Sequence, residues 1–375
     1  MAEIQGSCEA RFDGVRRALA ASLDAATDVG ASVAVYLHGD PVVDIWGGFT
    51  DETRTSAWGR DTLTNVWSTT KTMTFLCALM LADRGQLDFG APVVRYWPEF
   101  AQGAKEAIEV RHIMGHTSGL SGWEEPLEHH QLADWERCTT LLAAQVPWWE
   151  PGTVSGYHAL TQGYLIGEIV RRITGESIGQ WFAREVAKPL EADFYIGLPE
   201  SEDSRVSLVI PPPPLQLSGL GLPKVLVQTL TNPPLDATQV ANEWWRRSEI
   251  PAANGQGNAR SVAAIQSVIA GRGEARGVRL LSAKGTDPIF EQQSNGPDLV
   301  LTSVQRFGMG YGLSTPDMDI GPRACQWGGY GGSRIVMDQE TELTVAYMMN
   351  RMESALVVDR RGDTIMREAM RVVEA

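Results

Sequence analysis

The sequence predicts an α+β fold in which an antiparallel sheet, flanked by terminal helices, receives an inserted and mostly helical domain. Strand-like hairpin patterns occur near both ends of the chain, at residues 31–46 and 333–350, and helical patterns dominate between them. We therefore expect a discontinuous α/β domain made of residues 1–84 and 281–375, and a helical domain made of residues 85–280. Ligands commonly bind between two such lobes, so we expect an active-site cleft there.

The first part of the chain predicts a helix followed by a hairpin. Apolar residues from Phe12 to Leu23 recur at helical spacing, which predicts an amphipathic helix over residues 8–25. Two β-rich runs follow at residues 31–37 and 42–46, and the His-Gly-Asp-Pro segment that joins them is typical of a hairpin turn.

A buried helix is predicted next, and its start carries the first candidate for chemistry. Residues 72–82 contain no Gly or Pro and are followed by Gly85, which suits the position just after a helix. Ser68 is expected as the N-cap, and Lys71 lies one turn later on the same face. Burial and the positive helix terminus should both lower the pKa of Lys71. A neutral lysine beside a hydroxyl can act as a base, which would make Ser68 a nucleophile. The simpler alternative is a cap and a surface lysine.

The middle of the chain predicts helices and one irregular segment. Predicted helices cover residues 135–144, 160–173, 178–186 and 261–270. Residues 198–257 are interrupted by prolines and glycines and are expected to be irregular. With Trp244 and Trp245, this segment is expected to shape part of a binding pocket, and which part stays open.

The last part of the chain returns to strand patterns. Residues 324–327 predict a strand, and the runs at 333–337 and 343–350 predict a second hairpin. An amphipathic helix is predicted over residues 359–373. Strands and helices from both ends can therefore close one sheet.

Composition excludes several classes of function. The 375 residues carry a net charge of −14, which argues against nucleic acid as a partner. No apolar run is long enough to span a membrane, and the first residues lack the pattern of a signal peptide. Four scattered cysteines without metal-ligand spacing are expected to be free thiols in a cytoplasmic protein. We expect no metal and no cofactor, and oligomeric state stays open.

The second candidate is Tyr157, which lies in a Gly-rich segment just before the predicted helix at residue 160. A tyrosine at a helix entry can point its hydroxyl into a cleft. If it neared Lys71, the cation would lower the pKa of the phenol, which could then take the Ser68 proton and pass it to a leaving group. The alternative is a half-buried loop aromatic.

The third candidate is Trp327-Gly328-Gly329, at the end of a predicted strand. Paired glycines let a backbone approach a ligand closely. The backbone N–H of Tyr330, together with that of Ser68, could hold a developing oxyanion. The alternative is a plain glycine turn.

These three segments, in this order, resemble the serine β-lactamase and penicillin-binding-protein superfamily, and within it the family VIII carboxylesterases related to class C β-lactamases. The family's S-x-x-K motif matches at Ser68 and Lys71, its tyrosine motif at Tyr157, and its third motif, in the W-G-G form of the esterases, at Trp327. The resemblance covers nearly the whole chain. It implies a β-lactamase-like fold with Ser68, Lys71 and Tyr157 as catalytic residues, and Trp327, Gly328 and Gly329 as substrate-binding residues.

Two departures bear on the substrate. The β-lactamases carry K-T-G where this chain has W-G-G, so a cation that would bind a β-lactam carboxylate is missing. The family's Y-x-N is Tyr157-His158-Ala159 here, which removes a side-chain amide that contacts amide substrates. Both favour neutral esters.

The sequence therefore predicts a serine esterase that acts on short-chain or small acyl esters through an acyl-enzyme on Ser68. A β-lactamase or D-Ala-D-Ala peptidase, or an acyltransferase, would use the same site. A non-catalytic binding protein that retains the fold is the alternative of a different class, although all three motif residues are present.

Overall fold

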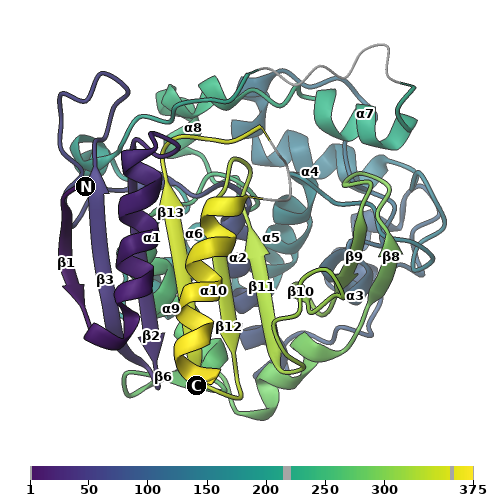
Figure 1. Ribbon diagram of the computed structural model, residues 1–375. Helices are drawn as coiled ribbons and strands as arrows, with labels where there is room; N and C mark the ends of the chain where they lie inside the picture. The colour runs from purple at the N-terminus through teal and green to yellow at the C-terminus, as the bar shows by residue number, and fades with distance from the viewer. Residues whose placement is uncertain (1, 214–220, 355–358, 375) are drawn as a thin grey trace.

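The computed structural model describes residues 2–213, 221–354 and 359–374, which fold around a nine-stranded antiparallel sheet (Figure 1). The strand order is β1-β3-β2-β13-β12-β11-β10-β9-β8. Strand β2 (Gly30–Leu37) pairs with β13 (Leu343–Met349), so the two ends of the chain meet in the middle of the sheet. This arrangement confirms the predicted fold class.

Both predicted hairpins are confirmed: β2 pairs with β3, and β12 pairs with β13. The other strands of the sheet are β1 (Ile4–Cys8), β3 (Asp40–Gly48), β8 (Ser294–Pro297), β9 (Val304–Phe307), β10 (Gly312–Leu313), β11 (Ala324–Gly328) and β12 (Arg334–Asp338). Two short pairs lie outside it, β4 (Thr64–Asn65) with β5 (Gln256–Gly257) and β6 (Glu274–Ala275) with β7 (Val278–Arg279).

Helices cover both faces of the sheet. The terminal helices α1 (Asp13–Asp24) and α10 (Arg360–Glu374) pack side by side on the face that is nearer the viewer in Figure 1. Helix α9 (Ala259–Ala270) packs on β2, β12 and β13 from the other face. Because β2 and β13 are covered on both sides, every residue of these two strands is buried.

Helix α2 (Thr70–Asp83) runs through the interior beside the sheet, and its residues from Thr70 to Leu81 are all buried. The other helices are α3 (Val110–Met114), α4 (Trp135–Ala144), α5 (Thr161–Thr174), α6 (Ile178–Phe182), α7 (Lys224–Thr231) and α8 (Glu243–Arg247). Helix α2 packs against α5 and α6, so it joins the sheet to the helical part of the molecule.

The structure corrects the expectation that residues 198–257 are irregular, because α7 and α8 lie there. Pro223 is the N-cap residue of α7, where its missing N–H does no harm, so prolines border this helix rather than exclude it. Part of the proline run at residues 211–214 lies outside the described residues. No described helix has the length and apolar character that crossing a membrane requires.

The division into two lobes stays a proposal. Helix α9 falls within the range of residues 85–280 given to the helical domain, yet it packs on the sheet. We therefore place α9 with the sheet within this proposal. The short pair β4–β5 and the hydrogen bond from Val66 N to Gly255 O, 2.9 Å long, join the end of the helical segment to the entry of α2.

Candidate active site

Ser68 lies in a short 3₁₀ turn (Trp67–Thr69) that leads directly into α2. The residue before it, Trp67, has a φ of +51°, a left-handed conformation that a bulky residue rarely adopts. The rings of Tyr330 and Trp245 pack on Trp67 at centroid distances of 5.5 and 5.8 Å and hold it there. Strained backbone of this kind occurs at functional sites more often than elsewhere.

The expected N-cap role of Ser68 is wrong, because Thr69 occupies the N-cap position of α2 and makes no side-chain cap. The Ser68 hydroxyl instead faces Lys71, whose Nζ lies 3.2 Å from the Ser68 Oγ. The predicted sharing of one helical face by these two residues is confirmed.

Lys71 is fully buried and is held by backbone carbonyls rather than by a carboxylate. Its Nζ donates to the carbonyl oxygens of Ala159, at 2.7 Å, and Ala252, at 3.0 Å. Burial lowers the pKa of Lys71 well below its ordinary value, as the sequence led us to expect. A neutral amine has two N–H groups and one lone pair. In this form, with both N–H groups given to carbonyls, the lone pair would be left for the Ser68 hydroxyl.

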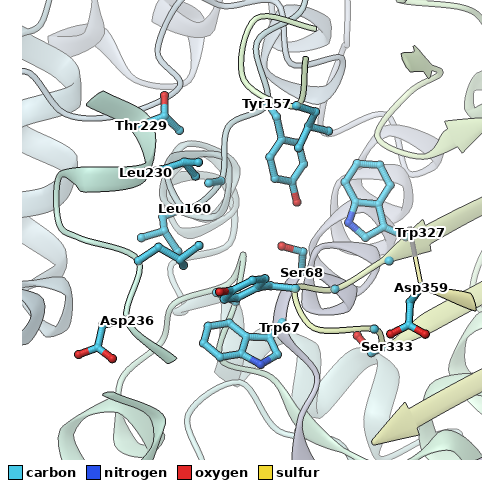
Figure 2. Close-up of a pocket in the computed structure, with 18 of the residues that line it drawn as sticks. Trp67, Ser68, Tyr157, Leu160, Thr229, Leu230, Asp236, Trp327, Ser333 and Asp359 are labelled. Carbon is cyan, nitrogen blue, oxygen red and sulfur yellow. The ribbon is translucent and has the colours of Figure 1, made fainter. Parts of the chain in front are cut away.

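Tyr157 reaches the same point from the segment before α5, and its hydroxyl points toward Ser68 (Figure 2). The Lys71 Nζ lies 4.8 Å from the centroid of the Tyr157 ring. The expected lowering of the Tyr157 pKa is wrong in direction. Burial raises the pKa of Tyr157, and the hydrogen bond with Ser68 offsets only part of this. The phenol is therefore neutral and carries a proton that it can donate.

Asp298 holds the Tyr157 segment in place. Its Oδ1 accepts hydrogen bonds from the backbone N–H groups of Tyr157, Val300 and Leu301, at 3.0, 2.8 and 2.8 Å. The side chain is 2% exposed, so these bonds form in a buried environment. Asp298 thereby ties Tyr157 to the turn that precedes β9.

The glycine pair lies against the start of α2. A Cβ added to Gly329 would lie 2.5 Å from the Val66 carbonyl oxygen, so only glycine allows this approach. The Ser333 hydroxyl donates to that same oxygen at 2.8 Å and lies 2.9 Å from the Thr69 hydroxyl. Among the described residues, the backbone N–H groups of Ser68 and Tyr330 donate to no other group.

One cavity contains these features, and Ser68, Tyr157 and Trp327 all line it. Figure 2 shows Leu160, Thr229 and Leu230 on the opposite side from Trp327. Further apolar residues that line the cavity are Leu132, Pro233, Pro234, Leu235, Trp245, Leu301 and Phe307. The predicted contribution of residues 198–257 to a pocket therefore holds for α7, the turn that follows it and Trp245.

Some site residues were missed from the sequence. Thr69, Asp298 and Ser333 contact the motif residues, but they belong to no recognisable pattern. Arg334 also lines the cavity, and Nη1 of its guanidinium would lie 3.3 Å from a Cβ added to Gly328. A cation is therefore present near the third motif, supplied by β12 instead of by the motif itself.

Comparison with known proteins agrees with this geometry. The chain matches the family model described as Beta-lactamase over residues 15–368. It is 34% identical over 367 residues to "Esterase/beta-lactamase LipL" of Mycobacterium tuberculosis (strain ATCC 25618 / H37Rv), an alignment that covers 94% of this chain and 84% of that protein.

Solved structures give the same result. The crystal structure of a family VIII carboxylesterase superposes with a TM-score of 0.94 at 39% identity and covers 99% of this chain and 100% of its own. A penicillin-binding protein homologue from Caulobacter crescentus has a TM-score of 0.91 at 32% identity, with 99% and 100% covered. The resemblance inferred from the three motifs is confirmed, and the chain belongs to the beta-lactamase family.

Proposed function

We propose that the protein is a serine carboxylesterase that hydrolyses short-chain or small acyl esters through an acyl-enzyme on Ser68. The observation that carries this proposal is that the Ser68 hydroxyl and the Tyr157 phenol meet at the wall of one cavity, with the buried Lys71 amine 3.2 Å from the Ser68 Oγ. The family VIII carboxylesterase and the M. tuberculosis esterase/beta-lactamase support it as relatives.

The acylation step divides the acid and base roles between two residues. Lys71, whose pKa burial lowers so that the neutral form is favoured, takes the proton of Ser68 as the Oγ bonds to the ester carbonyl carbon. The carbonyl electrons move to oxygen, and the N–H groups of Ser68 and Tyr330 hold this oxyanion. When the intermediate collapses, the bond to the alcohol oxygen breaks and Tyr157 gives that oxygen its proton. This leaves a lysine ammonium and a tyrosine phenolate.

Deacylation restores both groups. The Tyr157 phenolate takes a proton from water, and the resulting hydroxide attacks the acyl carbon. As the second intermediate collapses, the Ser68 Oγ leaves and takes the proton from Lys71. The products are the carboxylic acid and the original enzyme, and the steps balance without a metal or a cofactor.

The cavity lining supports neutral, small substrates. Five leucines, two prolines and six phenylalanine, tyrosine or tryptophan residues are part of it. Such a wall favours apolar acyl or alcohol groups over charged ones. We further propose a cytoplasmic location and an ester as the small-molecule partner, with no role for nucleic acid.

Hydrolysis of β-lactams is a second candidate, and Arg334 favours it. Its guanidinium lies beside Gly328 at the cavity, 3.6 Å from the Asp363 carboxylate, and the charge of Asp359 also acts on it. A substrate carboxylate could pair with it. Turnover of nitrocefin by the wild type, lost in Arg334→Met while ester turnover persists, would support this activity.

Assay of Ser68→Ala on p-nitrophenyl acetate and butyrate tests the esterase proposal. We expect loss of turnover, and a wild-type acyl adduct of the substrate's mass on the peptide that contains Ser68. Turnover near the wild-type rate in Ser68→Ala would refute the proposal.

A further inference from the structure

Trp327 places a buried indole N–H at the wall of the cavity. The residue is 4% exposed, and its indole Nε1–H has no hydrogen-bond partner of ordinary geometry among the described residues. Buried N–H groups without a partner are rare in native structures. A residue whose only task was to line the cavity would not need an indole nitrogen at this position.

Packing fixes the direction of this N–H. The Trp327 ring stacks on His116 at a centroid distance of 5.7 Å and an interplanar angle of 16°. Phe75 meets it edge-on at 5.1 Å, and Phe307 lies at 5.7 Å. His116 is itself held, because its Nδ1 accepts a hydrogen bond of 3.0 Å from the His158 backbone N–H. The indole therefore has little freedom to turn.

The indole nitrogen faces the Tyr157 hydroxyl. Figure 2 shows it on the side of Trp327 that is turned toward Tyr157 and Ser68. The centroids of the Tyr157 and Trp327 rings are 6.2 Å apart. Burial raises the pKa of Tyr157, whereas Ser68 and, to a smaller extent, the Trp327 N–H lower it. Hydrogen bonds at active sites often shorten only as charge develops.

The reaction creates charge at the Tyr157 oxygen. In the proposed function, on which this inference rests, Tyr157 becomes a phenolate when it protonates the alcohol and stays one until water attacks. A buried phenolate needs donors. Lys71 gives two of its N–H groups to Ala159 and Ala252, so it cannot satisfy this oxygen alone. An indole N–H can donate to a phenolate without losing its proton.

We infer that Trp327 is a positioning residue for Tyr157: its indole N–H donates a hydrogen bond to the Tyr157 oxygen as the phenolate forms. The tryptophan thus does more than remove the cation that the third motif carries in β-lactamases. Trp327 also supplies a neutral hydrogen-bond donor that faces Tyr157, the residue that protonates the leaving group.

The test replaces Trp327 with 3-benzothienylalanine, in which sulfur takes the place of the N–H at almost the same volume. The two substrates are ethyl butyrate and p-nitrophenyl butyrate, which share one acyl group. Ethanol must be protonated as it leaves, whereas p-nitrophenolate leaves without a proton. The control carries the same replacement at Trp46, whose indole N–H donates to Gln5 on the surface.

We expect kcat/KM for ethyl butyrate to fall by about 10- to 100-fold, the rate equivalent of one hydrogen bond to a charged oxygen. For p-nitrophenyl butyrate we expect less than about a threefold change. Equal rates for wild type and variant on ethyl butyrate, or equal losses on both esters, would overturn the inference.

The outcome separates this inference from the proposed function. If the variant still forms the Ser68 acyl adduct and hydrolyses both esters as the wild type does, the esterase stands and the role of Trp327 falls. If Ser68→Ala remains active, the proposed function falls first. A control variant at Trp46 that matches the wild type shows that the replacement itself is harmless.

Discussion

The amine of Lys71 lies 3.2 Å from the Ser68 hydroxyl and gives its two shorter hydrogen bonds to the carbonyl oxygens of Ala159 and Ala252. No carboxylate contributes to its pKa, and burial alone lowers it. These contacts suit a lysine that acts as a base, rather than a lysine that forms an ion pair with a carboxylate. A lysine paired with an acid would keep its proton, whereas this one is favoured in the form that can accept the proton of Ser68.

Substitution of Lys71 tests that relationship. Lys71→Arg should lose on the order of 10³-fold or more in kcat, because a guanidinium cannot give up its proton and so cannot act as the base. Lys71→Met removes the amine with a similar volume and should lose as much. The double variant Ser68→Ala/Lys71→Met should be no worse than either single variant. Substantial activity in Lys71→Arg would contradict the role of a neutral base.

The pH dependence follows from the directions of the two pKa shifts. Activity needs Lys71 neutral and Tyr157 protonated. Because the pKa of Lys71 is lowered, kcat/KM should rise with pH through a value below the ordinary lysine range. Because the pKa of Tyr157 is raised, the alkaline fall should come above the ordinary tyrosine range, or be hidden by unfolding.

Initial rates on p-nitrophenyl butyrate from about pH 5 to pH 10, corrected for hydrolysis without enzyme, measure the acid limb. Any activity that remains in Lys71→Met should show no acid limb in its pH profile. An activity that is constant and maximal down to the lowest pH would show that Lys71 is not the group that titrates.

Substitution of Asp298 tests whether this residue positions Tyr157. Asp298→Ala removes the acceptor of three backbone N–H groups, including that of Tyr157. We expect a loss of about 1–3 kcal/mol in the free energy of unfolding and a larger fall in kcat than change in KM. Asp298→Asn keeps an acceptor oxygen and should recover most of the stability. Denaturant titration and steady-state kinetics measure both effects, and an unchanged kcat in Asp298→Ala would remove this residue from the site.

The sequence predicted those features that depend on neighbours along the chain. Ser68 and Lys71 share a helical face because they lie three positions apart, and the two hairpins follow from their strand patterns and turns. Strand β1 was missed because its residues are mostly polar and exposed at the sheet edge. Strand β8, Ser294–Pro297, was missed because Gly and Pro within it are typical of turns.

Other features of the site depend on the tertiary structure and could not be found in this way. Ser333 contacts Thr69 across 264 positions of the sequence. The predicted direction of the Tyr157 pKa shift was wrong, because this shift depends on how completely the cavity excludes water. The prediction treated Lys71 as a nearby cation, but burial disfavours the charged form of both residues.

The two glycines of the third motif should respond differently to one added methyl group. A Cβ at Gly329 would lie 2.5 Å from the Val66 carbonyl oxygen, which is backbone and cannot move aside without shifting the turn that holds Ser68. A Cβ at Gly328 would meet Nη1 of Arg334 at 3.3 Å, and a side chain can adjust. Gly329→Ala should therefore lose about 10²-fold or more in kcat, as expected when an oxyanion donor is displaced.

Gly328→Ala is the matched control and should keep kcat within about threefold of the wild type, because the oxyanion donors stay in place. Parallel assays on p-nitrophenyl butyrate, with thermal unfolding to confirm that both variants fold, measure the difference. Equal losses in the two variants would mean that the close approach of Gly329 to Val66 does not set the oxyanion geometry. A selective loss in Gly329→Ala would tie that approach to the reaction, because the two changes add the same group one residue apart.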